Sequence, residues 1–143
     1  AITLAGDWLK GFIAVVAGHL LDQPAEILGL AGFAAFIGHL YPVFFGFKGG
    51  KGVATALGVL FGLSLYIGLG VTAVWLVMAF LFRYSSLAAL TAMALAPVII
   101  WFLLPNTFLV ATQAVISAIL FWRHRSNIRN LVDGKENKIG KRS

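Results

Sequence analysis

Cysteine is absent from all 143 residues of the chain. Disulfides, thiolate nucleophiles and cysteine-based metal sites are therefore excluded, because each of them needs a thiol. Charged residues are scarce as well: Asp, Glu, Lys and Arg make up 11% of the chain, against about a quarter of an ordinary soluble domain. Any chemistry must come from a small number of polar side chains.

The few charges are mainly positive, with eleven Lys and Arg against five Asp and Glu and a net charge of +6. On a nucleic-acid-binding surface such an excess is spread along one face of the fold. Here the cations gather at the ends of apolar segments. This distribution argues against a nucleic-acid partner and favours a lipid bilayer.

Apolar sequence is abundant: 60% of the residues are hydrophobic and the mean hydropathy is +0.93. Both values indicate an integral membrane protein. A membrane span needs roughly 20 apolar residues, and the connections between apolar segments are short. We therefore predict an all-α polytopic bundle of antiparallel neighbours with about six spans or half-spans. The predicted segments are residues 2–21, 25–41, 53–65, 66–82, 86–103 and 106–122. The segment at 53–65 is too short to cross and predicts a half-length helix or a dip in the bilayer.

Orientation follows from the positive-inside rule, because successive loops of such a bundle alternate between the two sides of the membrane. Lys48, Lys51 and Arg83 fall in every second loop, and the loops between them contain no Lys or Arg. We expect these cations, the first residue and the basic tail at 123–143 to face the cytoplasm.

Residues 1–122 are then a transmembrane bundle, and residues 123–143 are a basic cytoplasmic tail. The chain begins with Ala1 rather than Met. One further helix before Ala1 would give seven spans.

A glycine-rich, doubly basic loop separates the second and third segments, in the stretch Gly38 to Thr55, GHLYPVFFGFKGGKGVAT. Glycines allow consecutive N–H groups to turn toward one point, and nearby ammonium groups make that point attractive to a phosphate. A nucleotide-binding P-loop is excluded, because Phe45 and Gly52 occupy positions that require glycine and a hydroxyl. The alternative is a structural cytoplasmic turn whose lysines only set topology.

Two histidines flank the same membrane face. His39 ends the second segment, where a neutral imidazole can donate, accept or act as a general base. His124 and Asn127 follow the last span and, if the helix continues, share one face at i and i+3. A packing role for His39 and a stop-transfer role for the basic tail cluster are the competing interpretations.

Other polar residues at this face have simpler explanations. Ser85 and Ser86 begin the fifth segment, and we expect them to be N-caps. Asp7 and Lys10 are spaced i, i+3 in the first segment, which fits either mutual pairing or contact with a ligand.

These residues resemble a known family, the bacterial membrane acyl-phosphate:glycerol-3-phosphate acyltransferases. Residues 38–55 match the pattern G-H-x-x-P-x-F-x-x-F-x-G-G-K-G-V-A-T of its second signature at every fixed position. Residues 124–136 resemble its third signature, H-x-x-N-I-x-R-L-x-x-G-x-E, and residues 7–11 and 84–87 resemble its D-x-x-K-G and Y-x-S-L elements.

Two departures from the family pattern are visible. The first signature, a Ser-Gly-Asn-x-Gly-Ala-Thr-Asn stretch followed by an arginine, does not occur in the chain. The arginine position of the third signature holds Asn130, and Arg129 precedes it. The resemblance therefore predicts an active site that is incomplete in this chain.

The resemblance implies attack by the 1-hydroxyl of glycerol 3-phosphate on the carbonyl of acyl phosphate, giving lysophosphatidic acid and phosphate without a cofactor or metal. Lys51 would stabilise the developing charge, and whether His39, His124 or a substrate phosphate is the general base is left open. The implied catalytic residues are Lys51, His124, Asn127 and His39. The implied substrate contacts are Lys48, Gly49, Gly50, Gly52, Thr55, Ser86 and Arg125, and the implied structural residues are Asp7, Lys10 and Glu136.

Two other classes remain possible at this point. The chain would fit a small transporter or channel subunit for a phosphate-like anion, although no charged residue other than Asp7 and Lys10 lies well inside a span. It would also fit a non-catalytic assembly protein that holds lipid or a partner through its tail. The sequence does not indicate the oligomeric state.

Overall fold

The structure, a computed structural model, describes residues 2–42 and 49–140. This part of the chain consists of helices without strands, so the predicted all-α class is confirmed. Each of the six predicted segments contains one helix, and a seventh, short helix follows them. The helices are α1 (Ile2–Leu20), α2 (Ala25–Leu40), α3 (Val53–Leu63), α4 (Leu65–Phe82), α5 (Ser85–Leu103), α6 (Thr107–Arg123) and α7 (Arg125–Val132).

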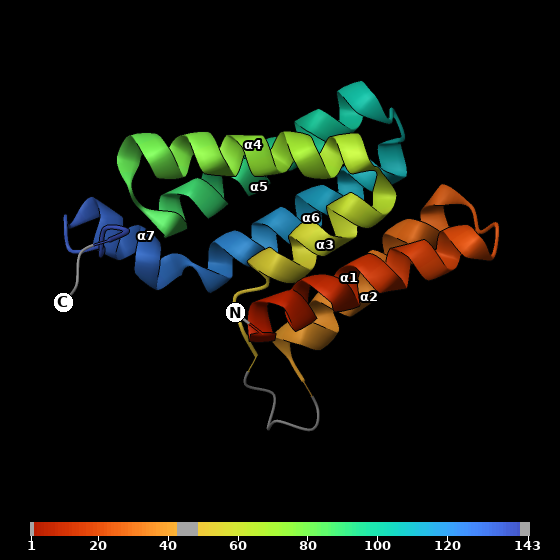
Figure 1. Ribbon diagram of the computed structural model, residues 1–143, viewed down its shortest axis with the longest axis horizontal. Coiled ribbons are helices and arrows are strands. Elements are labelled where there is room, and N and C mark those ends of the chain that lie inside the picture. Colours follow the sequence, from red (N-terminus) through yellow and green to blue (C-terminus); the bar gives the residue numbers. More distant parts are fainter. Residues whose placement is uncertain (1, 43–48, 141–143) are drawn as a thin grey trace.

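Short α3 lies between two antiparallel helix pairs, α1 with α2 and α4 with α5, and α6 packs against α2 and α5 (Figure 1). Glycines permit the close approach of α1 and α3. A Cβ atom on Gly58 would collide with the backbone oxygen of Trp8, and one on Gly11 would collide with that of Thr55. The small residues of α3 therefore serve helix packing, as is typical in lipid.

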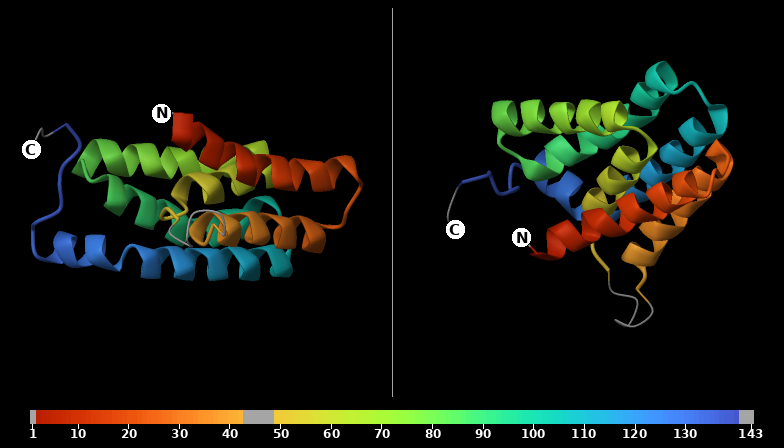
Figure 2. Two further views of the ribbon diagram at one scale, coloured as in Figure 1. Left: turned by 90° about the horizontal axis from the view of Figure 1, so that it is seen from below. Right: turned by 45° about the vertical axis from the view of Figure 1, so that its right-hand side comes forward.

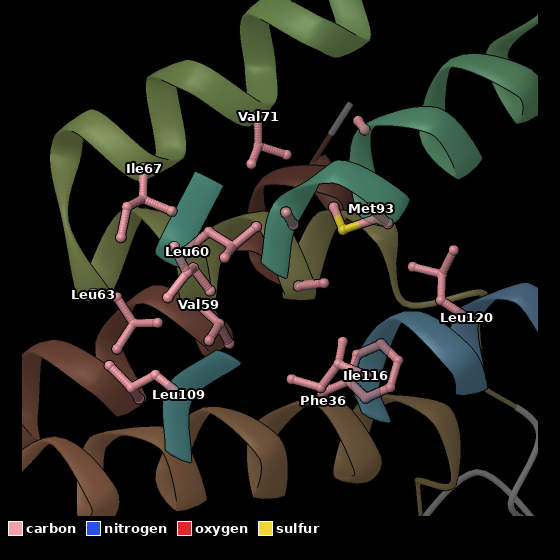
Figure 3. Packing of buried hydrophobic residues seen from close by; sticks show 14 of the residues in the cluster. Phe36, Val59, Leu60, Leu63, Ile67, Val71, Met93, Leu109, Ile116 and Leu120 are labelled. Atoms are coloured by element: carbon pink, nitrogen blue, oxygen red, sulfur yellow. The ribbon is translucent and has the colours of Figure 1, made fainter. Parts of the chain in front are cut away.

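Apolar side chains from α1 to α6 meet in one buried cluster. Figure 3 shows Phe36 of α2, Leu60 of α3 and Ile116 of α6 pointing into the same interior, and all three are at most 1% exposed. The outward faces are also apolar, as expected of helices that contact lipid. This core fixes the ends of α3, α5 and α6 relative to one another.

A buried polar network connects α5 and α6 near Pro97, which lies within α5. Proline has no N–H, so the Met93 carbonyl, four residues earlier, has no partner within its helix. The Ser117 hydroxyl donates to this carbonyl (2.7 Å), and the Gln113 amide donates to the Ser117 oxygen (3.2 Å). The partner that α5 lacks is thus supplied by α6.

Two helices of the described chain, α4 and α5, are long and apolar enough to cross a membrane. A third span results if α6 and α7 are counted together, although they are bent by 62°. The 11 residues of α3 cover only about 16 Å at roughly 1.5 Å per residue, about half of the hydrocarbon core.

The bend between α6 and α7 corrects one expectation. The last helix does not continue straight through the tail but stops at Arg123 and restarts at Arg125. The chain after α7 then turns back toward the end of α4 (Figure 2), where Ile139 N–H donates to Arg83 O (2.6 Å). The bend directs the tail across the end of the bundle.

Candidate functional site

An open pocket of about 1210 Å³ lies at the end of the bundle where α3 and α5 begin and α6 stops. Most of its wall is apolar, including Trp8 of α1 and Trp75 of α4. Its polar part is confined to a few side chains from distant parts of the sequence. These are Lys51, Thr72, Ser85, Ser86, His124, Asn127 and Glu136.

Hydrogen bonds join four of these side chains in a row. The Lys51 ammonium donates to Asn127 Oδ1 (2.5 Å), and Asn127 Nδ2 donates to Glu136 Oε1 (2.8 Å). The Ser86 hydroxyl donates to the same carboxylate oxygen (2.5 Å). Because the amide of Asn127 gives its N–H to Glu136, its carbonyl oxygen faces Lys51. Two of the three ammonium protons of Lys51 are not used by this row.

Glu136 is charged under ordinary conditions. Burial alone raises the pKa of its carboxyl group, but hydrogen bonds from Ser86, Asn127 and Asn130 and the charge of Lys51 outweigh burial and lower the pKa. The carboxylate therefore keeps its acceptor role, as the anchor for Ser86 and Asn127.

His124 follows α6 and is only 3% exposed. Its Nδ1 lies 2.8 Å from the Leu120 carbonyl oxygen, which can only accept, so Nδ1 carries the proton and Nε2 keeps its lone pair. Burial lowers the pKa of His124 and the Lys51 charge lowers it further, against opposing effects of the Leu120 carbonyl and Glu136. A neutral imidazole with a free Nε2 is suited to accept a proton.

The glycine loop reaches α3 through Gly52, whose φ of 87° is left-handed and favours glycine. The Phe36 ring occupies the space where a Cβ of residue 52 would lie. Gly49 and Gly50 offer their carbonyl oxygens to Arg123, at 3.0 Å each. Sequence reasoning missed this contact. Lys48 lies outside the described residues.

His39 belongs to a separate cluster with Asp7 and Lys10. Asp7 Oδ1 lies 2.7 Å from the Lys10 ammonium and 3.3 Å from His39 Nδ1, and Lys10 Nζ lies 3.1 Å from the same nitrogen. Mutual pairing of Asp7 with Lys10, one of the two interpretations of their spacing, is present. None of the three lines the pocket, and a catalytic role of His39 stays a prediction.

Thr55 and Arg125 also lie apart from the pocket lining. Thr55 is fully buried, and its hydroxyl has no hydrogen-bond partner among the described residues. Arg125 donates to the Trp122 carbonyl oxygen (3.0 Å), and its guanidinium lies 4.3 Å from the centre of the Trp122 ring. Their predicted contacts with substrate stay predictions.

The expectation that Ser85 and Ser86 cap α5 is wrong. Tyr84 is the N-cap, without a side-chain capping hydrogen bond. Both serines lie inside the first turn, and the Ser86 hydroxyl is drawn away by Glu136, 50 residues later. The sequence does not reveal this competition, because the tail that supplies the acceptor is distant.

The tail is attached by contacts that the sequence did not indicate. The Arg83 guanidinium donates to Ile139 O (3.0 Å), and the Lys138 ammonium lies 5.5 Å from the centre of the Tyr84 ring. These contacts hold the segment that carries Glu136 over the start of α5. Within the described ranges, no group of three or more His, Asp or Glu side chains is placed to hold a metal ion.

The arrangement suits an anionic ligand with an apolar part. Lys51 supplies positive charge, His124 supplies a proton acceptor, and the apolar wall supplies room for a hydrocarbon chain. Direct attack of one bound molecule on another fits this site better than covalent catalysis. The Ser86 hydroxyl donates to a carboxylate rather than to a histidine, so Ser86 does not form a serine–histidine pair.

Comparison with known proteins gives consistent results. The model of a family described as "Glycerol-3-phosphate acyltransferase" matches residues 1–134. A glycerol-3-phosphate acyltransferase of Hydrogenovibrio crunogenus is 54% identical over 142 residues, which are 99% of this chain and 68% of that protein. One from Neisseria meningitidis is 49% identical over 146 residues, covering 99% of this chain and 73% of the relative.

Two solved structures are similar in fold. The crystal structure of PlsY (YgiH), an integral membrane glycerol 3-phosphate acyltransferase, in its glycerol 3-phosphate form superposes with a TM-score of 0.91 and 41% identity. The match covers 97% of this chain and 70% of that one. The lysophosphatidic acid form gives a TM-score of 0.90 at the same identity, and covers 97% of this chain and 71% of the other.

Proposed function

Because this chain belongs to the glycerol-3-phosphate acyltransferase family, we propose that it transfers an acyl group to the 1-hydroxyl of glycerol 3-phosphate. The product is lysophosphatidic acid. The solved relatives were obtained with glycerol 3-phosphate and with lysophosphatidic acid, the acceptor and the product of this reaction. The chain is a multi-pass membrane protein, as its relatives and its apolar helices indicate.

One observation carries the proposal: the polar row from Lys51 to Glu136 and the buried His124 line a pocket whose wall is mostly apolar. The acceptor is small and doubly charged, whereas the acyl donor is mostly hydrocarbon. A pocket that is basic at one end and apolar along its wall accommodates both. We place the phosphate at Lys51, where two ammonium protons remain available to it.

Acyl phosphate is the donor that this site favours. In the proposed step, a bond forms between the 1-hydroxyl oxygen and the acyl carbon. The bond from that carbon to the phosphate oxygen breaks, and its electron pair leaves with phosphate. The leaving group is thus a small anion, which Lys51 stabilises as its charge develops. No enzyme nucleophile is needed, in agreement with the engaged Ser86 hydroxyl.

His124 accepts the hydroxyl proton through Nε2 in this proposal. Its Nδ1 proton is held by Leu120, and its lowered pKa keeps the ring neutral near pH 7. Asn127 and Ser86 are assigned as polar contacts to substrate. Glu136 orients both of them. The glycines before α3 are assigned to phosphate binding.

The site lies at the end of the bundle that carries Lys51, Arg83 and the basic tail. By the positive-inside rule we assign this end to the cytoplasmic face of the bacterial inner membrane. A soluble acceptor and a lipid-tailed donor meet there.

A transfer assay tests the proposal. The full natural polypeptide in membranes is supplied with labelled glycerol 3-phosphate and acyl phosphate, and lysophosphatidic acid is measured. We expect Lys51→Ala to abolish product formation. The matched control is Lys135→Ala, because Lys135 is exposed, pairs with Asp133 across 3.9 Å and does not line the pocket. Full activity of Lys51→Ala refutes the assigned site, and equal rates with an acyl thioester as donor refute the choice of donor.

A further inference from the structure

Arg123 ties the end of α6 to the glycine loop but does not line the pocket. Its Nη2 donates to the carbonyl oxygens of both Gly49 and Gly50, at 3.0 Å. These partners are 74 and 73 residues away in the sequence. The guanidinium also lies 5.7 Å from the centre of the Tyr41 ring. Arg123 therefore joins the ends of α2 and α6 to the loop that precedes α3.

The two carbonyl contacts determine where the loop's amide groups point. In a trans peptide, the C=O of one residue and the N–H of the next point in opposite directions, and no peptide of the described chain is cis. The N–H groups of Gly50 and Lys51 therefore point away from Arg123. Among the described residues, no backbone carbonyl accepts from either of them.

Other groups of the loop are already in contact with protein. Gly49 N–H donates to the Leu40 carbonyl oxygen (3.2 Å), and the His39 ring fills the space where a Cβ of Gly50 would lie. Gly50 and Lys51 lead directly into the first turn of α3, whose N-cap Gly52 offers no capping side chain. The N–H groups of Gly50 and Lys51 are therefore available to an anion.

We propose that Arg123 is a positioning residue for the phosphate of the substrate. By holding two carbonyl oxygens on the far side of the loop, it presents the N–H groups of Gly50 and Lys51 to the anion. It also keeps the negative ends of the carbonyl dipoles away from the anion, where they would repel it. The inference rests on the proposed function, because it deepens the account of the same phosphate site.

Arginine is well suited to this role. Its planar guanidinium stays charged and presents N–H donors in a fixed geometry, whereas a lysine ammonium is a compact, strongly hydrated point charge. We therefore expect Lys at position 123 to restore the contact only in part. This graded response differs from that of a charge acting at a distance, for which any cation would suffice.

The test compares kinetic constants of the full natural polypeptide in three variants. Arg123→Met removes charge and donors at similar length, and Arg123→Lys keeps the charge. Arg129→Met is the matched control, because Arg129 is exposed on α7 and does not line the pocket. KM for glycerol 3-phosphate, kcat and the inhibition constant of inorganic phosphate are measured, with the thermal midpoint as the readout of folding.

We expect Arg123→Met to raise KM for glycerol 3-phosphate and the inhibition constant of phosphate by about tenfold or more, with kcat within about threefold of the natural protein. Both constants of Arg123→Lys should lie between those of the natural protein and those of Arg123→Met. Both constants of Arg129→Met should equal those of the natural protein. A folded Arg123→Met with unchanged KM overturns the inference, as does an equal effect of Arg129→Met. If Arg123→Met does not fold, an unchanged KM in Arg123→Lys overturns it.

The outcomes separate this inference from the proposed function. An inactive Lys51→Ala together with an unchanged Arg123→Met contradicts only the role of Arg123. A fully active Lys51→Ala contradicts the proposed phosphate site, whatever the Arg123 variants do.

Discussion

Substitution of Ser117 tests the role assigned to the hydrogen bond that α6 supplies to α5 near Pro97. In Ser117→Ala the Met93 carbonyl loses its hydrogen-bond donor, and Pro97 provides none within the helix. A buried polar group without a hydrogen-bond partner costs about 1–3 kcal/mol. The measured contribution of an interhelical hydrogen bond in a membrane protein is at most about 1.7 kcal/mol. We therefore expect a loss of about 1–2 kcal/mol in the free energy of unfolding.

A double-mutant cycle isolates this contribution. Pro97→Ala supplies the missing N–H, so the Met93 carbonyl regains a hydrogen-bond donor within α5. Ser117→Ala should then cost much less in the Pro97→Ala background, by about 1 kcal/mol or more. The remaining cost reflects Gln113, which loses the Ser117 oxygen as its acceptor in both backgrounds.

The assay is reversible unfolding in mixed micelles with increasing denaturing detergent, followed by tryptophan fluorescence. The matched control is Thr112→Val. The Thr112 hydroxyl also donates to a carbonyl, that of Phe108 (2.8 Å), but this carbonyl lies within an uninterrupted helix. Thr112→Val should cost less than Ser117→Ala. Additive effects of Ser117→Ala and Pro97→Ala would refute the reasoning.

Three further predictions concern the site and its packing. His124→Gln should lower kcat by about 10²-fold or more through loss of the base. In the natural protein, kcat should fall only below pH 6.5, the ordinary pKa of histidine, because the His124 pKa is lowered; a pH–rate profile whose acid limb lies above pH 6.5 contradicts this. The tail should be held by Glu136 above its unfolded pKa of 4.5 and released as pH falls through the lower folded value. The rate at which a protease cleaves the tail, measured at several pH values, tests this. A cleavage rate that does not depend on pH contradicts it, as does the same rate for the natural protein and Glu136→Gln at pH 7. Gly58→Leu should prevent stable folding, because α1 lies where the new side chain would be, and a normal thermal midpoint contradicts that close packing.

The helices could be predicted because lipid makes strong local demands on the sequence. The apolar segment predicted at 66–82 corresponds to α4 at Leu65–Phe82, and that at 106–122 to α6 at Thr107–Arg123. A span must satisfy its backbone internally, so hydropathy alone outlines it. The alternation of cations predicted that Lys51 and His124 share one end of the bundle, and both line the same pocket.

The parts of the site that escaped prediction depend on contacts between distant residues. Ser86 reads locally as a cap, but a carboxylate delivered by the tail competes for its hydroxyl. The bend at His124 directs that tail. Residues 120–128 contain no proline or glycine that would predict the bend. Arg123 reads as one more topogenic cation, because its carbonyl acceptors lie on another loop.

His39 is a further residue whose partners the sequence did not indicate. Its place beside the glycine loop suggested a base, yet its Nδ1 faces Asp7 and Lys10 outside the pocket. The partners of a histidine decide its role, and those partners lie on another helix.

Equilibrium binding of labelled glycerol 3-phosphate, without any acyl donor, tests the central claim most directly. The claim is that Lys51, at the basic end of the pocket, holds the substrate phosphate. The account predicts that Lys51→Ala weakens binding by about tenfold or more, whereas Lys135→Ala leaves it unchanged. Equal binding by the natural protein and Lys51→Ala would contradict the account.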